Sequence, residues 1–544
     1  MFRTRSSVDA VLIAIAIVSR MGAVWVLQSH LVPRSTYEHG EIASNLLAGR
    51  GFAIKFLGAD GPTSQQAPVY PAIVAAAYAI GGIETPRSLF LLETGQSVLG
   101  GLLVLGVLHL CQSLAPGRKW IAWTAGLVVA LHPTLVYAAT HVQVATLATT
   151  LLTWTLAWAH QTGASGTRRD ALITGGLLGL LTLTDPILAF SAVGVIWAIW
   201  QTGSGIPRDL RRSLGLIAVA VIVSLTSISP WLVRNALVHG EFVAIKSTFG
   251  YAFWQGNCAL SEGTDKVVRP SVEHMLDRDP AESMQSGLNG KLSGRWDVGL
   301  TSASSVESES PTYGSMLSGL NRTLWEARHE AGYLDDIALT KADFRLLGSV
   351  SEPERSRILF SRAISDLKAD PVRYVRLCLR RLRYFIFFDE TNPKTRVLAY
   401  RVPHVMLTGF ALIGLLLTPP SVRKRLGPTI AAVALIALFH SLTIVSTRFH
   451  IPIEPLLAIW GAAGLVSYGG DSVRSGSLRA AGHHVERVRL VDRLAVVHGG
   501  AGFRLLRRVT VHERQYQAGK HGAGADQDST PPGDAWHDGG ISPR

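Results

Sequence analysis

Long apolar runs, separated by short polar connections, recur along most of the chain. Each is close to the length of about 20 residues that an α-helix needs to cross a bilayer, although several are shorter. This pattern predicts an α-helical polytopic membrane protein with about ten transmembrane helices. The predicted spans are residues 8–29, 88–113, 119–137, 141–160, 171–184, 187–202, 213–234, 402–418, 428–446 and 452–469.

A further apolar run, residues 69–82, is only about 14 residues long, which is typical of re-entrant or interfacial helices. We predict that it lies at the outer face without crossing. The basic residues at the ends of the ten spans then all fall on one side, which the positive-inside rule assigns to the cytoplasm. They are Arg3, Arg5, Arg118, Lys119, Arg168, Arg169, Arg208, Arg211, Arg212, Arg423, Lys424 and Arg425. The prediction is a multi-pass protein of the inner (plasma) membrane, with both termini in the cytoplasm.

This topology divides the chain into four regions. Residues 352–388 within the second region have apolar residues at helical spacing and many arginines beside Phe and Tyr, which favours an interfacial helix against anionic head groups. The four predicted regions are a transmembrane module 1–235 with the external loop 30–87, an external α-rich segment 236–401, C-terminal transmembrane helices 402–469, and a basic, mostly disordered cytoplasmic tail 470–544.

Composition agrees with a membrane protein that also has substantial polar segments. Of the 544 residues 48% are hydrophobic and 17% are charged, against about 25% charged in average soluble proteins. The net charge of +13 is spread over the predicted cytoplasmic loops and the tail, so we expect no nucleic-acid partner. Three cysteines, none in a CxxC pair, exclude a disulfide framework and argue against thiol-based metal or redox chemistry. The first apolar run has no A-x-A cleavage site, so we interpret it as a retained span.

The first external loop contains two acids, Glu38 and Glu41, directly after the first span. A carboxylate at the membrane surface suits a general base that acts on a hydroxyl beside a lipid-borne substrate. Spacing alone also fits a simpler interpretation, in which the acids favour the dipole at the start of a short helix.

Four segments of the chain, in this order, resemble the GT-C class of membrane glycosyltransferases. The resemblance is to the bacterial group related to protein mannosyltransferases and the lipid A aminoarabinose transferase, and it covers most of residues 1–469. The segments are YEHGEIASNLLAGRGF with GPTSQQAPVYP (37–71), PWLVRNALVHGEFVAIKSTFGYAFWQGN (230–257), EPERSRILFSRAISDLKADPVRYVRL (352–377) and TRFHIPIEPLLAIWGAAGL (447–465).

The resemblance implies a GT-C fold and transfer of a sugar from a polyprenyl-phosphate-linked donor to a lipid, glycan or protein acceptor of the envelope, with inversion. It implies that Glu38, with Glu41 as second choice, is the catalytic base. It also implies that Arg448, and as a second candidate Arg234, binds the donor phosphate, for which a guanidinium fork is suited. Both arginines also fit ordinary snorkelling at the interface.

The second external loop, HPTLVYAATHVQVATL (132–147), departs from the family. His141 and Gln143 stand where the family carries an acid, which argues against metal coordination at that loop and leaves open an altered acceptor or reduced activity. The two residues are candidates for acceptor contacts, or they end a helix hairpin. No metal ligand is assigned, no cofactor is certain, and a divalent metal is left open.

Three further charged residues are interpreted structurally. Asp185 before Pro186 has the pattern of a helix N-cap with proline in the first turn. Glu454, between two prolines, is expected to fix the start of the last helix. Arg20 lies in mid-span and needs a partner inside the bundle, for which a carboxylate is one candidate.

Two rival functions stay open. A membrane transporter or lipid flippase is compatible with ten spans and an interior charge, but the chain has no internal repeat, and its long external segment is unusual for a transporter. The second rival is a non-catalytic GT-C relative that binds lipid-linked sugar and scaffolds a wall or envelope assembly, which the missing second-loop acid favours. In each case membrane lipids are expected partners.

Overall fold

The computed structural model describes residues 6–31, 36–201, 210–267, 332–392, 395 and 398–465. These residues belong to one compact unit, Met1–Tyr468. The predicted disordered tail 470–544 and most of the polar part of segment 236–401 lie outside the described residues. The division of the remainder into a transmembrane module, an external segment and C-terminal helices stays a prediction.

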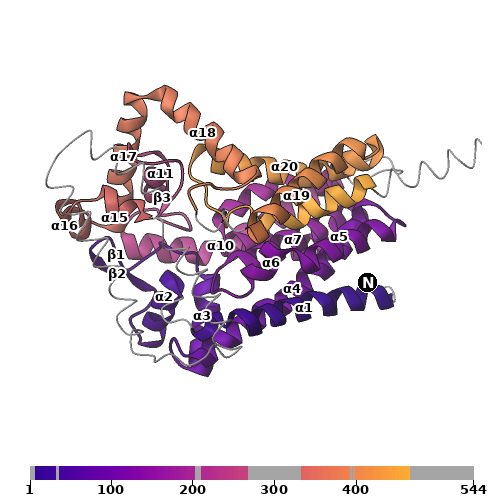
Figure 1. The fold of residues 1–544 in the computed structure, drawn as a ribbon, viewed down its shortest axis with the longest axis horizontal. Helices are drawn as coiled ribbons and strands as arrows, with labels where there is room; N and C mark the ends of the chain where they lie inside the picture. Colours follow the sequence, from indigo (N-terminus) through magenta and orange to yellow (C-terminus); the bar gives the residue numbers. More distant parts are fainter. Residues whose placement is uncertain are drawn as a thin grey trace, which may run out of the picture. The chain divides into compact units, whose positions relative to one another are not determined.

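The described residues form a predominantly helical protein, and each predicted span coincides with one or two of its helices. The bundle helices are α1 (Ser7–Leu27), α4 (Pro86–Leu114), α5 (Lys119–Leu131), α6 (Pro133–Ala138), α7 (Ala145–Ser165), α8 (Arg168–Thr182), η2 (Pro186–Ser191), α9 (Ala192–Gln201), α10 (Leu210–His239), α19 (Leu398–Leu417), α20 (Pro420–Leu442) and a last helix that starts with η4 (Ile451–Ile453) and ends at Leu465. Figure 1 shows them packed side by side.

Among the described residues, five helices are long and apolar enough to cross a membrane, namely α1, α4, α10, α19 and α20. Four shorter apolar helices accompany them, one of which is α3 (Val69–Gly81), the run that we predicted not to cross. The predicted class, an α-helical polytopic membrane protein, is confirmed. The number of spans, about ten, stays a prediction because the shorter helices do not reach the length that a membrane crossing needs.

Two of the breaks between bundle helices occur at prolines. Asp185 caps η2, since its carboxylate accepts a hydrogen bond from the Ile187 N–H at 3.2 Å, with Pro186 in the first turn. This confirms the predicted cap. His132 ends α5 in an extended conformation before Pro133 begins α6. The residue before a proline is disfavoured in the α region, so the helix ends there.

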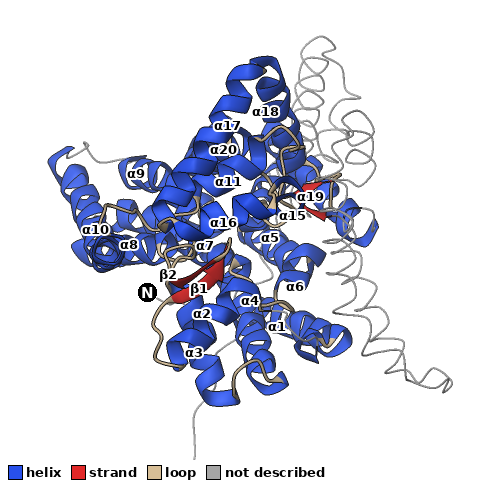
Figure 2. Ribbon diagram, turned by 90° about the vertical axis from the view of Figure 1, so that its left-hand side faces the viewer, coloured by secondary structure: helices blue, strands red, loops and turns tan. Residues whose placement is uncertain are grey.

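The remaining elements lie outside the bundle helices and come from two distant parts of the chain. They are α2 (Tyr37–Leu47), β1 (Ala53–Phe56), β2 (Ala59–Pro62), α11 (Phe249–Asn257), β3 (Lys266–Val267), β4 (Gly332–Tyr333), α15 (Leu334–Ala338), α16 (Lys341–Ser349), α17 (Glu352–Ala369) and α18 (Pro371–Ile386). Figure 2 shows the antiparallel β1–β2 hairpin between α2 and α16, which contact its two strands. Loop 30–87 is therefore packed against the external segment.

Three contacts join helix ends that the basic residues assign to the cytoplasmic side. The Trp123 indole donates to Asp9 at 2.9 Å, which joins the starts of α5 and α1. Arg212 at the start of α10 donates to the Gly166 carbonyl at 2.9 Å, and Gln201 at the end of α9 donates to the Lys424 carbonyl. These contacts join predicted cytoplasmic ends in three separate pairs. That these ends face the cytoplasm stays a prediction.

Two buried polar groups differ from the sequence-based expectation. The Arg20 guanidinium donates to the carbonyls of Ala16, Val129 and Ala130 at 3.0–3.2 Å, so its partners are backbone groups and not a carboxylate. The predicted interfacial helix 352–388 is two helices, because Asp370 caps a second one that starts at Pro371. Arg381 on that second helix is fully buried, so it faces protein and not lipid head groups.

Candidate functional site

The first external loop is held so that Glu38 lies in the first turn of α2. Gly40 allows this turn to approach its neighbours, since a Cβ there would overlap the Thr36 side chain and lie 2.8 Å from the Tyr78 hydroxyl. Ile42 and Ala43 of the same helix are fully buried. Within the described part of the chain the half-buried Glu38 carboxylate makes no hydrogen bond or salt bridge, so it is available to a ligand.

Lys246, from the connection between α10 and α11, joins Glu38 to charges from other segments. Burial lowers the pKa of its ammonium group; the negative charges of Asp185 and Glu38 raise it, and the positive charge of Arg448 lowers it. The ammonium group donates to the Gln66 side chain at 3.0 Å. Four charged residues that are far apart in sequence are therefore near enough to influence one another.

His39 belongs to the same group of charges. Burial lowers its pKa to about 4, while Glu38 raises it and Lys246 and Arg448 lower it. The imidazole is therefore neutral at physiological pH. Its ring packs edge-on against Tyr70 with 4.9 Å between centroids, and its buried Nδ1 has no hydrogen-bond partner among the described residues.

Glu41, the second candidate for the base, is in a different position. Its carboxylate accepts a hydrogen bond from the Lys55 backbone N–H at 2.7 Å and thereby ties α2 to the first strand of the hairpin. This contact gives Glu41 a structural role. Of the two candidates, Glu38 is therefore the one whose carboxylate makes no such contact among the described residues.

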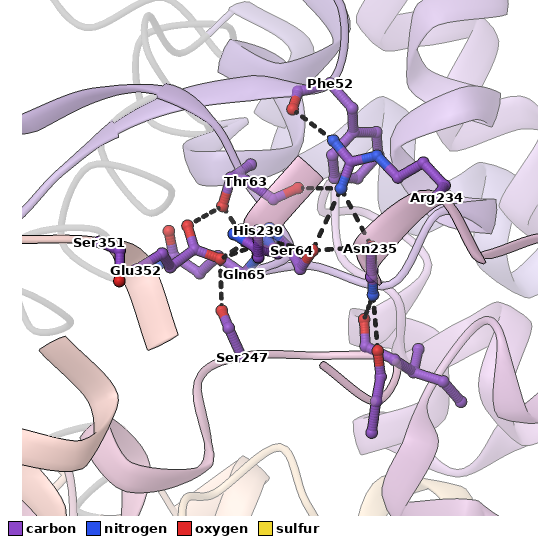
Figure 3. Close-up of polar contacts among 12 residues, drawn as sticks. Phe52, Thr63, Ser64, Gln65, Arg234, Asn235, His239, Ser247, Ser351 and Glu352 are labelled. Atoms are coloured by element: carbon purple, nitrogen blue, oxygen red, sulfur yellow. Dashed lines mark hydrogen bonds and ion pairs between the residues drawn. The ribbon is translucent and has the colours of Figure 1, made fainter. Parts of the chain in front are cut away.

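Arg234 holds the loop to α10 (Figure 3). Its guanidinium donates to the carbonyls of Thr63 and Phe52 at 2.6 and 3.1 Å, and to the Ser64 hydroxyl at 3.1 Å. It also lies over the rings of Phe52 and Trp231, 5.4 and 4.8 Å from their centroids. Donor-phosphate binding by Arg234 stays a prediction, but these contacts favour a structural role because its donors already have protein acceptors.

Glu352, the first residue of α17, joins the same contacts from the external segment (Figure 3). Its carboxylate accepts hydrogen bonds from the Thr63 hydroxyl, the Ser64 N–H and the Ser247 hydroxyl at 2.5–2.7 Å. The His239 imidazole lies 3.8 Å from it. One carboxylate thus links loop 30–87, the segment after α10, and α17.

Within the residues that the structure describes, Arg448 is the phosphate candidate whose guanidinium makes no hydrogen bond or ion pair. It is exposed, and its guanidinium lies 5.6 Å from the centroid of the Phe449 ring. The electrostatic effects on Lys246 and His39 place it near the Glu38 group.

The second external loop is closed by backbone contacts. The Gln143 side chain donates to the Ala138 carbonyl at 3.2 Å, and His141 Nδ1 lies 2.9 Å from the Thr140 hydroxyl. Gln96 from α4 donates to the His141 carbonyl at 2.8 Å. These contacts favour the interpretation of His141 and Gln143 as the end of a helix hairpin; acceptor binding by them stays a prediction.

Sequence reasoning missed Lys246, His39 and Glu352 as parts of this site. The one available signal for Lys246 was a lone cation within the apolar stretch EFVAIKSTF (241–249). It also missed that His404, His450 and Glu454, all buried, form a group whose ligand atoms lie within 4.8 Å of one another and could hold a metal ion.

No family model and no curated protein matches the chain. Among solved structures, the chain is similar to the Archaeoglobus fulgidus oligosaccharyltransferase in complex with zinc and sulfate, with 13% identity, a TM-score of 0.44 and coverage of 89% of this chain. It spans about half of that protein, 51%. It is also similar to ArnT from Cupriavidus metallidurans bound to undecaprenyl phosphate, with 14% identity, a TM-score of 0.34 and coverage of 84% of this chain and 77% of the other. Both are GT-C glycosyltransferases, the class that the sequence resembles. Because these identities and TM-scores are low, the proposed function is derived from the residues of this chain.

Proposed function

We propose that the protein transfers a glycosyl group from a polyprenyl-phosphate-linked donor to an acceptor hydroxyl, with Glu38 as general base. The observation that carries this proposal is the position of the Glu38 carboxylate. It has no hydrogen-bond partner among the described residues, and it shares its electrostatic surroundings with two cations, Lys246 and Arg448. A base beside a cationic phosphate site is the arrangement that such a transfer needs.

The chemistry follows from these groups. Glu38 takes the proton of the acceptor hydroxyl, and the acceptor oxygen attacks the anomeric carbon of the donor sugar. The bond from that carbon to the phosphate oxygen breaks on the opposite face, so the configuration inverts. Polyprenyl phosphate leaves with the bonding electron pair, and the positive charges of Arg448 and Lys246 stabilise it. Phosphate held in this way needs no general acid.

Arg448 and Lys246 have complementary parts in the proposal. The exposed guanidinium of Arg448 can reach a phosphate at the membrane surface and bind it through two parallel hydrogen bonds. Lys246 supplies a point charge fixed by Gln66. The proposal places the reaction at the outer face of the inner membrane, because the positive-inside rule assigns the basic loops predicted from the sequence to the cytoplasmic side.

The decisive test compares Glu38→Gln with Glu41→Gln. Membranes that contain each variant are supplied with labelled polyprenyl-phosphate sugars, and transfer of label is measured together with released polyprenyl phosphate. We expect Glu38→Gln to lose about 10²–10⁴-fold of the rate and Glu41→Gln to keep most of it, because glutamine can still accept the Lys55 hydrogen bond through its carbonyl oxygen. Glu354→Gln, an exposed acid on α17, is the matched control.

Wild-type rates in Glu38→Gln would remove the proposed base, and loss only in Glu41→Gln would reverse the two assignments. Donor binding without transfer to any acceptor by the wild-type protein would instead select the non-catalytic binding role, which the absence of an acid at His141 and Gln143 favours. Transport of a lipid-linked sugar across vesicles without any glycosyl transfer would select the flippase.

A further inference from the structure

Four titratable side chains from three distant parts of the chain meet inside the bundle. His132 is the residue between α5 and α6, His404 belongs to α19, and His450 and Glu454 flank η4 at the start of the last helix. Glu454 is fully buried, and the three histidines are 2–6% exposed. Neither the proposed glycosyl transfer nor the packing of apolar helices accounts for this cluster.

The distances within the cluster match those between ligands of one metal ion. Nδ1 of His404 and Nδ1 of His450 lie 3.2 and 3.1 Å from the same Glu454 oxygen, Oε1. Nδ1 of His132 lies 3.3 Å from the other oxygen, Oε2. Ligands at about 2.0–2.1 Å from a tetrahedral zinc ion are about 3.3 Å apart.

The position of the proton on the His404 ring also indicates a cation at this site. Its Nε2 lies 3.2 Å from the Ile386 carbonyl, which can only accept, so Nε2 carries the proton. In the neutral imidazole, Nδ1 then presents a lone pair toward Glu454, which is also an acceptor. This contact requires either a buried imidazolium or a cation between the two groups. A metal-binding histidine normally donates its other N–H to a carbonyl in this way.

The polar atoms around Glu454 are also incompletely satisfied. Glu454 Oε2 and both ring nitrogens of His132 are buried and make no hydrogen bond of acceptable geometry within the described part of the chain. No lysine or arginine pairs with Glu454 among the described residues. A buried carboxylate needs a compensating charge, which either an imidazolium or a bound cation would supply.

We propose that His404, His450 and Glu454 bind a divalent metal ion, with zinc favoured because imidazole and carboxylate ligands in a four-coordinate site suit it. His132, whose Nδ1 lies 3.3 Å from the second carboxylate oxygen, is a positioning residue beside the site. The ion connects α19 to the last helix and fixes the turn that carries Arg448, two residues before His450. Its proposed ligands are not members of the Glu38 group, and its existence does not depend on the proposed reaction.

The full-length protein, purified in detergent without chelator, provides the test. Its metal content is measured by plasma mass spectrometry, and the metal is then removed with a chelator and replaced with Co²⁺, whose visible absorption reports a four-coordinate site. We expect about one zinc ion per chain, an intense Co²⁺ band, and a higher melting temperature with zinc than after chelation.

Variants assign the ligands. His404→Gln and Glu454→Gln are expected to lower the metal content at least about tenfold, while His160→Gln, a buried histidine of α7 outside the cluster, keeps it. Equal metal content in all variants would overturn the assignment. A wild-type protein without metal, without the Co²⁺ band and without a melting shift would overturn the site itself, and this result requires no folded variant. The cluster would then be a buried His404–Glu454 ion pair.

Discussion

Removal of the Glu352 carboxylate should weaken the attachment of the loop that carries Glu38 to the external segment. The three donors to this carboxylate are the Thr63 hydroxyl, the Ser64 N–H and the Ser247 hydroxyl. The Glu352 side chain is only 11% exposed, and Ser64 is fully buried. In Glu352→Ala the two hydroxyl groups can turn to other acceptors, but the Ser64 N–H loses its partner.

The expected loss of stability follows from the number of contacts that the Glu352 carboxylate makes. A hydrogen bond to a charged group contributes about 1.5–3 kcal/mol, and a buried donor left without a partner costs about 1–3 kcal/mol. Three such contacts, reduced for water that reaches the exposed edge, give a loss of about 3–5 kcal/mol in Glu352→Ala. Glu352→Gln keeps one acceptor oxygen, and Thr63 can accept from the new amide, so its loss should be about 1–2 kcal/mol.

The assay is thermal unfolding of the detergent-solubilised protein, followed by tryptophan fluorescence. Glu354→Ala, on the same helix, is the control, since its pairing with Arg357 is exposed and contributes less than about 1 kcal/mol. We expect the melting temperature to fall most in Glu352→Ala, less in Glu352→Gln and least in Glu354→Ala. Equal shifts in Glu352→Ala and Glu354→Ala would refute the idea that this carboxylate holds the loop.

Three further predictions test other parts of the structure. Because the pKa of His39 is about 4, the unfolded chain takes up a proton below about pH 6.5 that the folded protein binds only near pH 4. Stability should therefore fall as pH decreases through this window, and less steeply in His39→Gln; parallel melting curves against pH would contradict this. Gly58→Ala should lower stability by about 1–3 kcal/mol, because φ at Gly58 is +85° and the new Cβ would lie 2.6 Å from the Phe344 carbonyl. Limited proteolysis of the hairpin measures this loss, and unchanged cleavage would refute the prediction. Arg381→Met should lower the melting temperature more than Arg380→Met. Arg381 is buried and donates to the carbonyls of Ser441 and Gly256 at 2.7 Å, whereas Arg380 is exposed. Similar shifts in the two variants would show that these contacts contribute little.

The sequence by itself determined the features that depend on neighbouring residues. The apolar runs predicted the positions of the bundle helices, since a helix in a membrane satisfies its own backbone hydrogen bonds within one segment. Asp185 before Pro186 predicted a cap, and the cap is present, because the acceptor and the donor N–H are two residues apart. Glu38 was singled out by its place directly after the first span, although its catalytic role stays a prediction.

Only the tertiary structure decided which distant side chains share one site. Lys246 looks like an ordinary lysine in the sequence, and only packing brings it near Glu38 and Arg448. The buried arginines differed from expectation for the same reason, since Arg20 and Arg381 bind backbone carbonyls that helix packing presents to them.

The cluster around Glu454 likewise could not be predicted from neighbouring residues. His132 precedes Glu454 by 322 positions, and no local pattern marks the two as partners. Local rules of capping and periodicity act within a few residues, so they specify helices and their ends. A site whose members come from α5, α19 and the last helix is specified by how those helices pack, and that is decided by non-local contacts that no single segment encodes.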